Sequence, residues 1–86
     1  MTQKIRQISD ISLGNNLRNL RISANLTQEQ VVAQLQLRNI SISRSVYSQI
    51  EGGTYNIKVS EILALAEIFR TDFNTIFSGL FINNQP

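Results

Sequence analysis

Apolar residues recur along this chain at spacings of three and four, the pattern typical of amphipathic helices. The first such helix is expected over about 13–24, with apolar positions at Leu13, Leu17, Leu20 and Ala24. Asp10 or Ser12 can cap its start, and Asn25 suits the left-handed conformation that ends a helix.

Two short helical patterns follow with a tight connector between them. Thr27 is a suitable N-cap, and Gln30 three residues later completes a capping box. The packing stripe of this second helix consists of Val31, Val32 and Leu35. Ser43 can cap a third helix over about 44–51, which the pair Gly52 and Gly53 would stop.

The remaining pattern predicts two more helices. The fourth has a strongly apolar face made of Val59, Ile62, Leu63, Leu65, Ala66 and Phe69. Asp72 can cap a short fifth helix, and Gly79 closes it. Five short helices with brief connectors, no strand signal and no repeat predict an all-α domain.

The periodicity also divides the chain. Residues 1–11 show no clean period and are expected to form an N-terminal arm, followed by the helical domain over 12–78 and a tail over 79–86. The tail begins with residues more apolar than an exposed end should carry, so they either cover the domain's own core or join a subunit interface. The candidates for a dimer interface are Phe73, Ile76, Phe77, Leu80, Phe81 and Ile82.

Composition argues against catalysis. The 86 residues contain no cysteine and no histidine, which removes the commonest metal ligands and the commonest general base. The six acidic residues are scattered, with no close pair for carboxylate chemistry. We therefore expect no enzyme, no metal and no cofactor. No apolar run is long enough to span a membrane and no secretory signal is apparent, so a cytoplasmic protein is expected.

The net charge of +2 is unevenly distributed. Through residue 50 the basic residues are Lys4, Arg6, Arg18, Arg21, Arg38 and Arg44, against only Asp10 and Glu29. Beyond that point the acidic residues outnumber the basic ones. A polyanion would be attracted to the first half, although an uneven solvated surface would show the same bias.

The third predicted helix has two chemically different faces. At about 100° per residue, one arc holds Arg44, Ser45, Ser48, Gln49 and Gly52, and the opposite arc holds Val46, Tyr47 and Ile50. One face can pack, while the other offers the donors and acceptors that match base edges in the DNA major groove. The pattern predicts a helix-turn-helix DNA-binding domain.

From Leu13 to Phe77 the chain resembles the Cro/C1-type (Xre) family of helix-turn-helix repressors, which has a lambda-repressor-like fold. The matching segments are Leu13-Gly14-x-x-Leu17-Arg18-x-Leu20-Arg21, Leu26 to Gln30, Ile42 to Ser45, Ile50-Glu51-x-Gly53, and Leu63 to Phe69 with Phe73 to Phe77. No single motif is specific, but their order and spacing are.

The resemblance implies a homodimer that binds double-stranded DNA with its third helix in the major groove. It implies base readout by Arg44, Ser45, Ser48 and Gln49, and phosphate contacts from Gln28, Ser43, Tyr55, Asn56 and Lys58. It also implies a structural ion pair between Arg21 and Glu51. The segment between Leu35 and Ile42 is about four residues longer than the usual turn, and Gly52 replaces a side chain that often reaches DNA.

Two functions remain in view. The first is a sequence-specific transcriptional regulator, most simply a repressor, with an antitoxin that binds its own operator as a close variant. The second is an interaction module that keeps the fold and binds a partner protein through the fifth helix and the tail. Nothing in the sequence indicates an effector pocket.

Overall fold

A computed structural model describes the backbone of residues 2–79 and the side chains of residues 13–79. The described residues form five helices and no strand, so the all-α prediction is confirmed. The helices are α1 (Thr2–Ser23), α2 (Gln28–Leu37), α3 (Arg44–Gly52), α4 (Val59–Phe69) and α5 (Phe73–Ile76).

The first helix begins far earlier than its apolar repeat indicates. The predicted start near residue 13 is wrong, because α1 runs from Thr2 without a break. The segment before Gly14 contains neither glycine nor proline, so nothing in it interrupts helical hydrogen bonding, and a helix does not require an apolar stripe. The predicted stop is correct: Asn25 has a φ of 60°.

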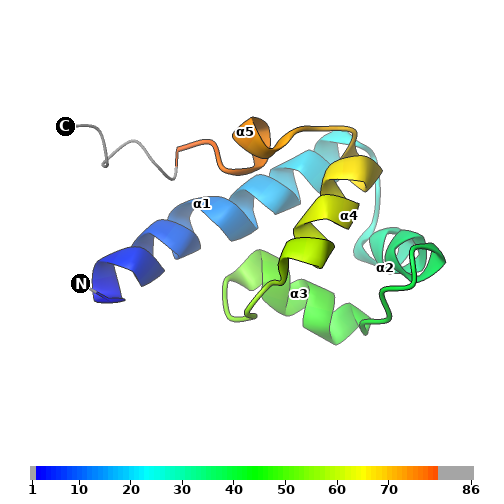
Figure 1. The fold of residues 1–86 in the computed structure, drawn as a ribbon, viewed down its shortest axis with the longest axis horizontal. Helices are drawn as coiled ribbons and strands as arrows, with labels where there is room; N and C mark the ends of the chain where they lie inside the picture. Colours follow the sequence, from blue (N-terminus) through cyan, green and yellow to red (C-terminus); the bar gives the residue numbers. More distant parts are fainter. Residues whose placement is uncertain (1, 80–86) are drawn as a thin grey trace.

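Helix α1 is the longest element, and the others are arranged around its C-terminal half (Figure 1). Helices α3 and α5 pack against α1, and α2 packs against both α3 and α4. The side-chain amide of Asn16 fastens α5, donating hydrogen bonds of 2.8 Å to the carbonyls of Ile76 and Ser78. Because α3 packs against both α1 and α2, these two helices determine the orientation of α3.

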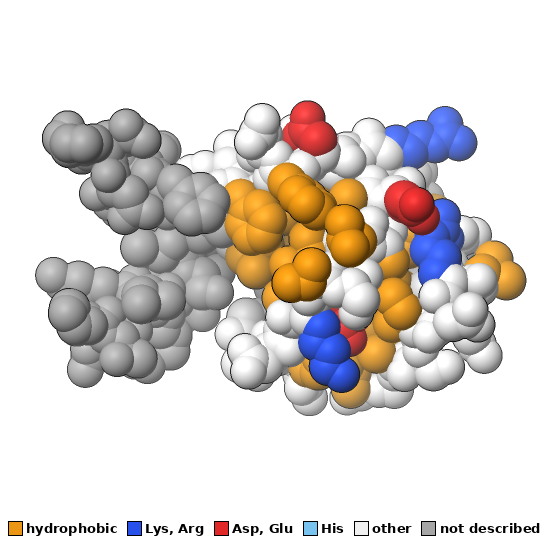
Figure 2. Space-filling view, in the orientation of Figure 1, with side chains coloured by type: hydrophobic (Ala, Val, Ile, Leu, Met, Phe, Trp, Pro, Cys, Tyr) orange, Lys and Arg blue, Asp and Glu red, His pale blue; other side chains and the backbone are white. Residues whose placement is uncertain are grey.

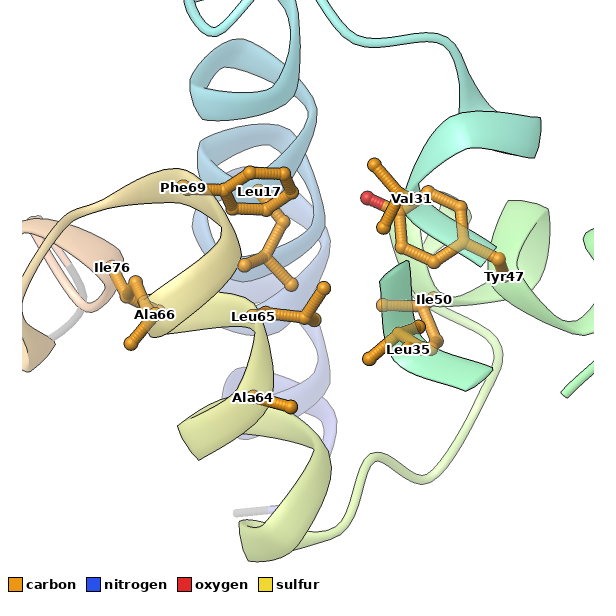
Figure 3. Close-up of a cluster of buried hydrophobic side chains, with 10 residues drawn as sticks. All are labelled: Leu17, Val31, Leu35, Tyr47, Ile50, Ala64, Leu65, Ala66, Phe69 and Ile76. Carbon is orange, nitrogen blue, oxygen red and sulfur yellow. The ribbon is translucent and has the colours of Figure 1, made fainter. Parts of the chain in front are cut away.

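The core lies where α1, α2, α3 and α4 meet. Figure 3 shows Leu65 pointing from α4 toward Leu35 and Ile50, with Leu17 of α1 beside Phe69. Leu17, Leu35 and Leu65 are fully buried. Complete burial of one such side chain contributes about 1.5–3 kcal/mol. The core therefore joins the helix-turn-helix pair to the rest of the domain.

Helix α4 uses only part of its apolar pattern for the core. Leu65, Ala66 and Phe69 are buried as predicted, whereas Val59 and Leu63 are 71% and 50% exposed. At about 100° per residue, both are turned well away from Leu65, which faces the core, with Leu63 nearly opposite it. The six apolar residues of this helix therefore do not form a single buried face, and Val59 and Leu63 remain on the surface.

The longer segment between α2 and α3 is accommodated in the turn. Helix α2 ends at Leu37, Arg38 is its C-cap, and Asn39 adopts a left-handed conformation with a φ of 65°. Ile40 and Ile42 then pack against the core. The extra residues are thus anchored at both ends of the turn.

Candidate nucleic-acid interface

Helix α3 has a defined start and a defined end. The Ser43 hydroxyl accepts a 3.0 Å hydrogen bond from the backbone N–H of Val46, as the sequence predicts for an N-cap. At the other end Gly53 has a φ of 83°, a left-handed conformation that glycine adopts without steric cost. These two caps determine which residues belong to α3.

The inner face of α3 is buried, and at one point it approaches α1 unusually closely. Tyr47 is completely buried and Ile50 is 4% exposed. Gly14 lies directly under the end of α3, where an added Cβ would overlap the carbonyl oxygen of Glu51 and lie 2.9 Å from its carbonyl carbon. Only a residue without a side chain allows this separation between α1 and α3.

A buried ion pair ties the same end of α3 to the two helices behind it. Arg21 donates from Nε to Glu51 Oε2 at 2.7 Å and from Nη2 to Glu51 Oε1 at 3.2 Å. Its Nη1 also donates to the Leu26 carbonyl at 2.9 Å. Gln28, the first residue of α2, donates to Glu51 Oε1 at 3.1 Å. Glu51 therefore joins α1, α2 and α3.

This network keeps Glu51 ionised. Burial raises the pKa of Glu51, but its contacts with Arg21, Tyr47 and Gln28 outweigh burial and hold that pKa below its usual 4.5. The same contact with Glu51 raises the pKa of Arg21. Tyr47 lies nearby with its hydroxyl buried and outside normal hydrogen-bond geometry, and burial raises its pKa well above 10. The site is a fixed charge pair at neutral pH.

The outer face of α3 lines a shallow hollow of about 480 Å³. Its lining consists of Arg44, Ser45, Ser48, Gln49, Gly52 and Thr54. All four residues predicted to read bases are exposed and share this hollow. The structure thus gathers on one surface the side chains that the sequence pattern places on one arc.

Arg44 has a neighbour that the sequence did not indicate. Its Nε lies 3.9 Å from Oε2 of Glu29, a residue of the first turn of α2. Both side chains are more than half exposed, at 64% and 72%. An exposed pair at this distance contributes between zero and about 1 kcal/mol, so Arg44 can leave it for a stronger partner.

The five residues predicted to contact phosphate fall into two groups. Ser43, Asn56 and Lys58 are exposed. Gln28, in contrast, is turned toward Glu51, and Tyr55 donates its hydroxyl to Glu61 Oε2 at 3.1 Å. This bond raises the pKa of Tyr55.

The predicted interface residues are likewise divided. Phe73 is 44% exposed and meets Phe77 edge to face with ring centroids 6.3 Å apart. Ile76 is fully buried in the core of the domain, so its side chain is not exposed for contact with a partner. Leu80, Phe81 and Ile82 lie outside the described residues.

The structural roles of two residues, Gly14 and Glu61, were not predicted from the sequence. Gly14 falls inside a helix, where its contact with α3 leaves no local signal. Glu61 is 4% exposed, and its carboxylate accepts hydrogen bonds from the backbone N–H of Lys58 at 2.8 Å and from the hydroxyl of Tyr55. Glu61 makes the half of a capping box that bonds back to the N-cap N–H, but Lys58 has no side-chain acceptor for the other half, so the sequence carries no capping-box signature here.

The described part of the chain contains no group of three or more acidic side chains arranged to hold a metal ion. Within the same residues, no helix combines the length and hydropathy needed to cross a lipid bilayer.

Comparison with known proteins assigns the chain to a family of helix-turn-helix domains, in agreement with the arrangement of α2 and α3. Residues 12–74 match the family model described as "Helix-turn-helix domain", and the chain belongs to this family. No curated protein and no solved structure matches the chain. The matched range contains α2, α3 and the Arg21–Glu51 pair, so the match covers all residues of the candidate nucleic-acid interface.

Proposed function

We propose that this chain is a sequence-specific transcriptional regulator of the Cro/C1 type, which inserts α3 into the DNA major groove. The observation that carries the proposal is the hollow on the outer face of α3, where Arg44, Ser45, Ser48 and Gln49 meet while the inner face is buried. A short helix held from behind and polar in front is the geometry of a recognition helix.

The exposed side chains have the chemistry for reading bases. A guanidinium such as that of Arg44 can donate two parallel hydrogen bonds to O6 and N7 of guanine, and the amide of Gln49 can pair with N6 and N7 of adenine. Ser45 and Ser48 discriminate less, because a hydroxyl both donates and accepts. We assign the main specificity to Arg44 and Gln49.

Phosphate contacts are assigned first to Ser43, Asn56 and Lys58, which are exposed. Gln28 keeps a second amide hydrogen that Glu51 does not use, so it can still donate to a phosphate. Tyr55 has only one hydroxyl hydrogen and gives it to Glu61, so it can join only by breaking that bond. Few ionic contacts imply a shallow dependence of affinity on salt.

We further propose that the chain binds its operator as a homodimer and represses by covering a promoter. Hydrophobic side chains gather on the surface over α4 (Figure 2), where Val59 and Leu63 are exposed, and Phe73 of α5 is exposed as well. Apolar residues grouped in this way are typical of an interface. The change Phe73→Glu should shift sedimentation toward the monomer, whereas Leu37→Glu, at an exposed leucine that ends α2, should not. Equal masses for both variants and the wild type would remove this surface as the interface.

The proposed readout is tested by fluorescence anisotropy with DNA from upstream of the gene and with scrambled DNA, at two salt concentrations. Arg44→Ala should weaken binding to the preferred duplex by roughly 1–3 kcal/mol while leaving thermal unfolding unchanged. Arg18→Ala is the matched control, because Arg18 is an exposed arginine on α1 outside the hollow. Equal losses for both variants would mean general charge attraction, and no binding to any duplex would favour a protein-interaction module.

A further inference from the structure

Gly52 is a glycine that the protein's own structure does not require. Gly14 allows the close contact between α1 and α3, and Gly53 has a positive φ. Gly52 has a helical backbone as the last residue of α3, and a Cβ added to it would meet no atom within 4 Å. Glycine weakens a helix relative to alanine, so the missing side chain brings no benefit inside this molecule.

Gly52 lies on the outer face of α3, among the residues that line the hollow. At about 100° per residue, Gly52 falls between Arg44 and Gln49 around the axis of α3. Ser45 and Ser48 lie in the same arc, and all five residues line the hollow. The hollow therefore has a floor of small residues between two long polar side chains, and Gly52 keeps that floor open.

A phosphate is poorly suited to this place. The C-terminal end of a helix carries partial negative charge, which repels an anion. The nearby backbone donors are also occupied: the N–H of Gly53 bonds to the Ile50 carbonyl at 3.3 Å, and the N–H of Thr54 bonds to the Gln49 carbonyl at 3.1 Å. A neutral base edge suits the floor of the hollow better than the DNA backbone does.

Among the base edges in the major groove, thymine alone projects a methyl group. A methyl needs space and an apolar contact rather than a hydrogen bond. The bare Cα of Gly52 supplies both, with no side chain in the way. If Gln49 reads an adenine, the same base pair presents a thymine methyl group in the groove that α3 would enter.

We propose that Gly52 is a specificity-determining residue that admits the methyl group of an operator thymine into the hollow between Arg44 and Gln49. This inference rests on the proposed function and deepens it by naming a base. The preference arises from steric fit, because a side chain at position 52 would occupy the space that the methyl fills.

The test begins with a duplex that the wild-type protein selects from a pool of random DNA. Each thymine of one half-site is then replaced in turn by deoxyuridine, which removes only the methyl group. For the wild type, one replacement should weaken binding about fourfold, the expected value for one buried methyl group. Gly52→Ala should bind the thymine duplex roughly tenfold more weakly, and it should no longer distinguish thymine from uracil at that position.

Ser60→Thr is the matched control, because it adds one methyl at an exposed position of α4 outside the hollow. It should keep both the affinity and the preference for thymine. Gly52→Ala should unfold at the same temperature as the wild type or higher, which excludes misfolding as the cause. Unchanged affinity for Gly52→Ala, or a retained preference for thymine over uracil, would overturn this inference alone. If selection yields no preferred sequence, the proposed function fails together with it.

Discussion

On its inner face α3 presents Tyr47, Ile50 and Glu51 to the helices behind it, whereas its outer face presents Arg44, Ser48 and Gly52 to solvent. The inner side chains have neighbours that determine their size and charge. The outer side chains have almost none: Arg44 has a single long ion pair, and Gly52 has open space above it.

If α3 reads DNA as proposed, this difference separates stability from recognition within the nine residues of α3. An inner residue is constrained by the folded protein itself, because changing it leaves a cavity, a clash or an unpaired charge. An outer residue can change without such a cost, so under the proposed function its identity can follow the sequence of the DNA. Substitutions on the two faces should therefore have effects of different kinds, and the following predictions test this distinction.

The largest effect is expected from Glu51→Ala. The change removes the carboxylate partner of the Arg21 guanidinium, which is 13% exposed, and leaves it the hydrogen bond to the Leu26 carbonyl. Removing one partner of a buried ion pair costs about 3–5 kcal/mol of the free energy of unfolding. Urea unfolding measures this loss. Gln49→Ala on the outer face is the control and should remain within about 0.5 kcal/mol of the wild type. Similar losses for both variants would contradict the separation of the two faces.

A smaller but still clear effect is expected from Gly14→Ala. The new Cβ overlaps backbone atoms of Glu51, which cannot rotate away as a flexible side chain would. Forcing the two helices apart should cost about 1–3 kcal/mol, although alanine favours a helix more than glycine does. Gly52→Ala is the matched glycine on the outer face and should leave the free energy of unfolding unchanged or slightly higher. A stabilised Gly14→Ala would show that α1 and α3 do not approach as closely as the structure indicates.

The smallest effect is a pH dependence located on the inner face. The pKa of Glu51 is lower in the folded protein than the 4.5 of a free carboxyl group, so the stability it provides is fully present above pH 4.5. That contribution is lost as the pH falls through the native pKa. Unfolding measured on both sides of pH 4.5 should therefore show a decline in the wild type that is smaller in Glu51→Gln.

Part of this decline will persist in the variant, because a hydrogen bond from the backbone N–H of Thr75 lowers the pKa of Asp72. Identical pH profiles for the wild type and Glu51→Gln would mean that the carboxylate of Glu51 is not stabilised in the folded protein.

The sequence predicts the local parts of this fold well. The Thr27–Gln30 capping box, the Ser43 cap and the glycine stop of α3 depend on residues a few positions apart, so the sequence shows them directly. The two faces of α3 also follow from periodicity alone. The start of α1 was missed, because the prediction relied on apolar spacing, which a helix does not need.

By itself, then, the sequence determined the helices after Leu26, the N-caps of α2, α3 and α5, the glycine end of α3 and the polar face of α3. Only the tertiary structure decided which polar side chains have hydrogen-bond donors left for a partner. Gln28 and Tyr55 are polar and suitably placed in the sequence, yet each already donates a hydrogen bond to a buried carboxylate. Gly14 and Gly52 look alike in the sequence, but one lies against the backbone of α3 and the other faces open space. The physical reason is that hydrogen-bond occupancy and free volume depend on neighbours brought together by folding, which no local pattern encodes.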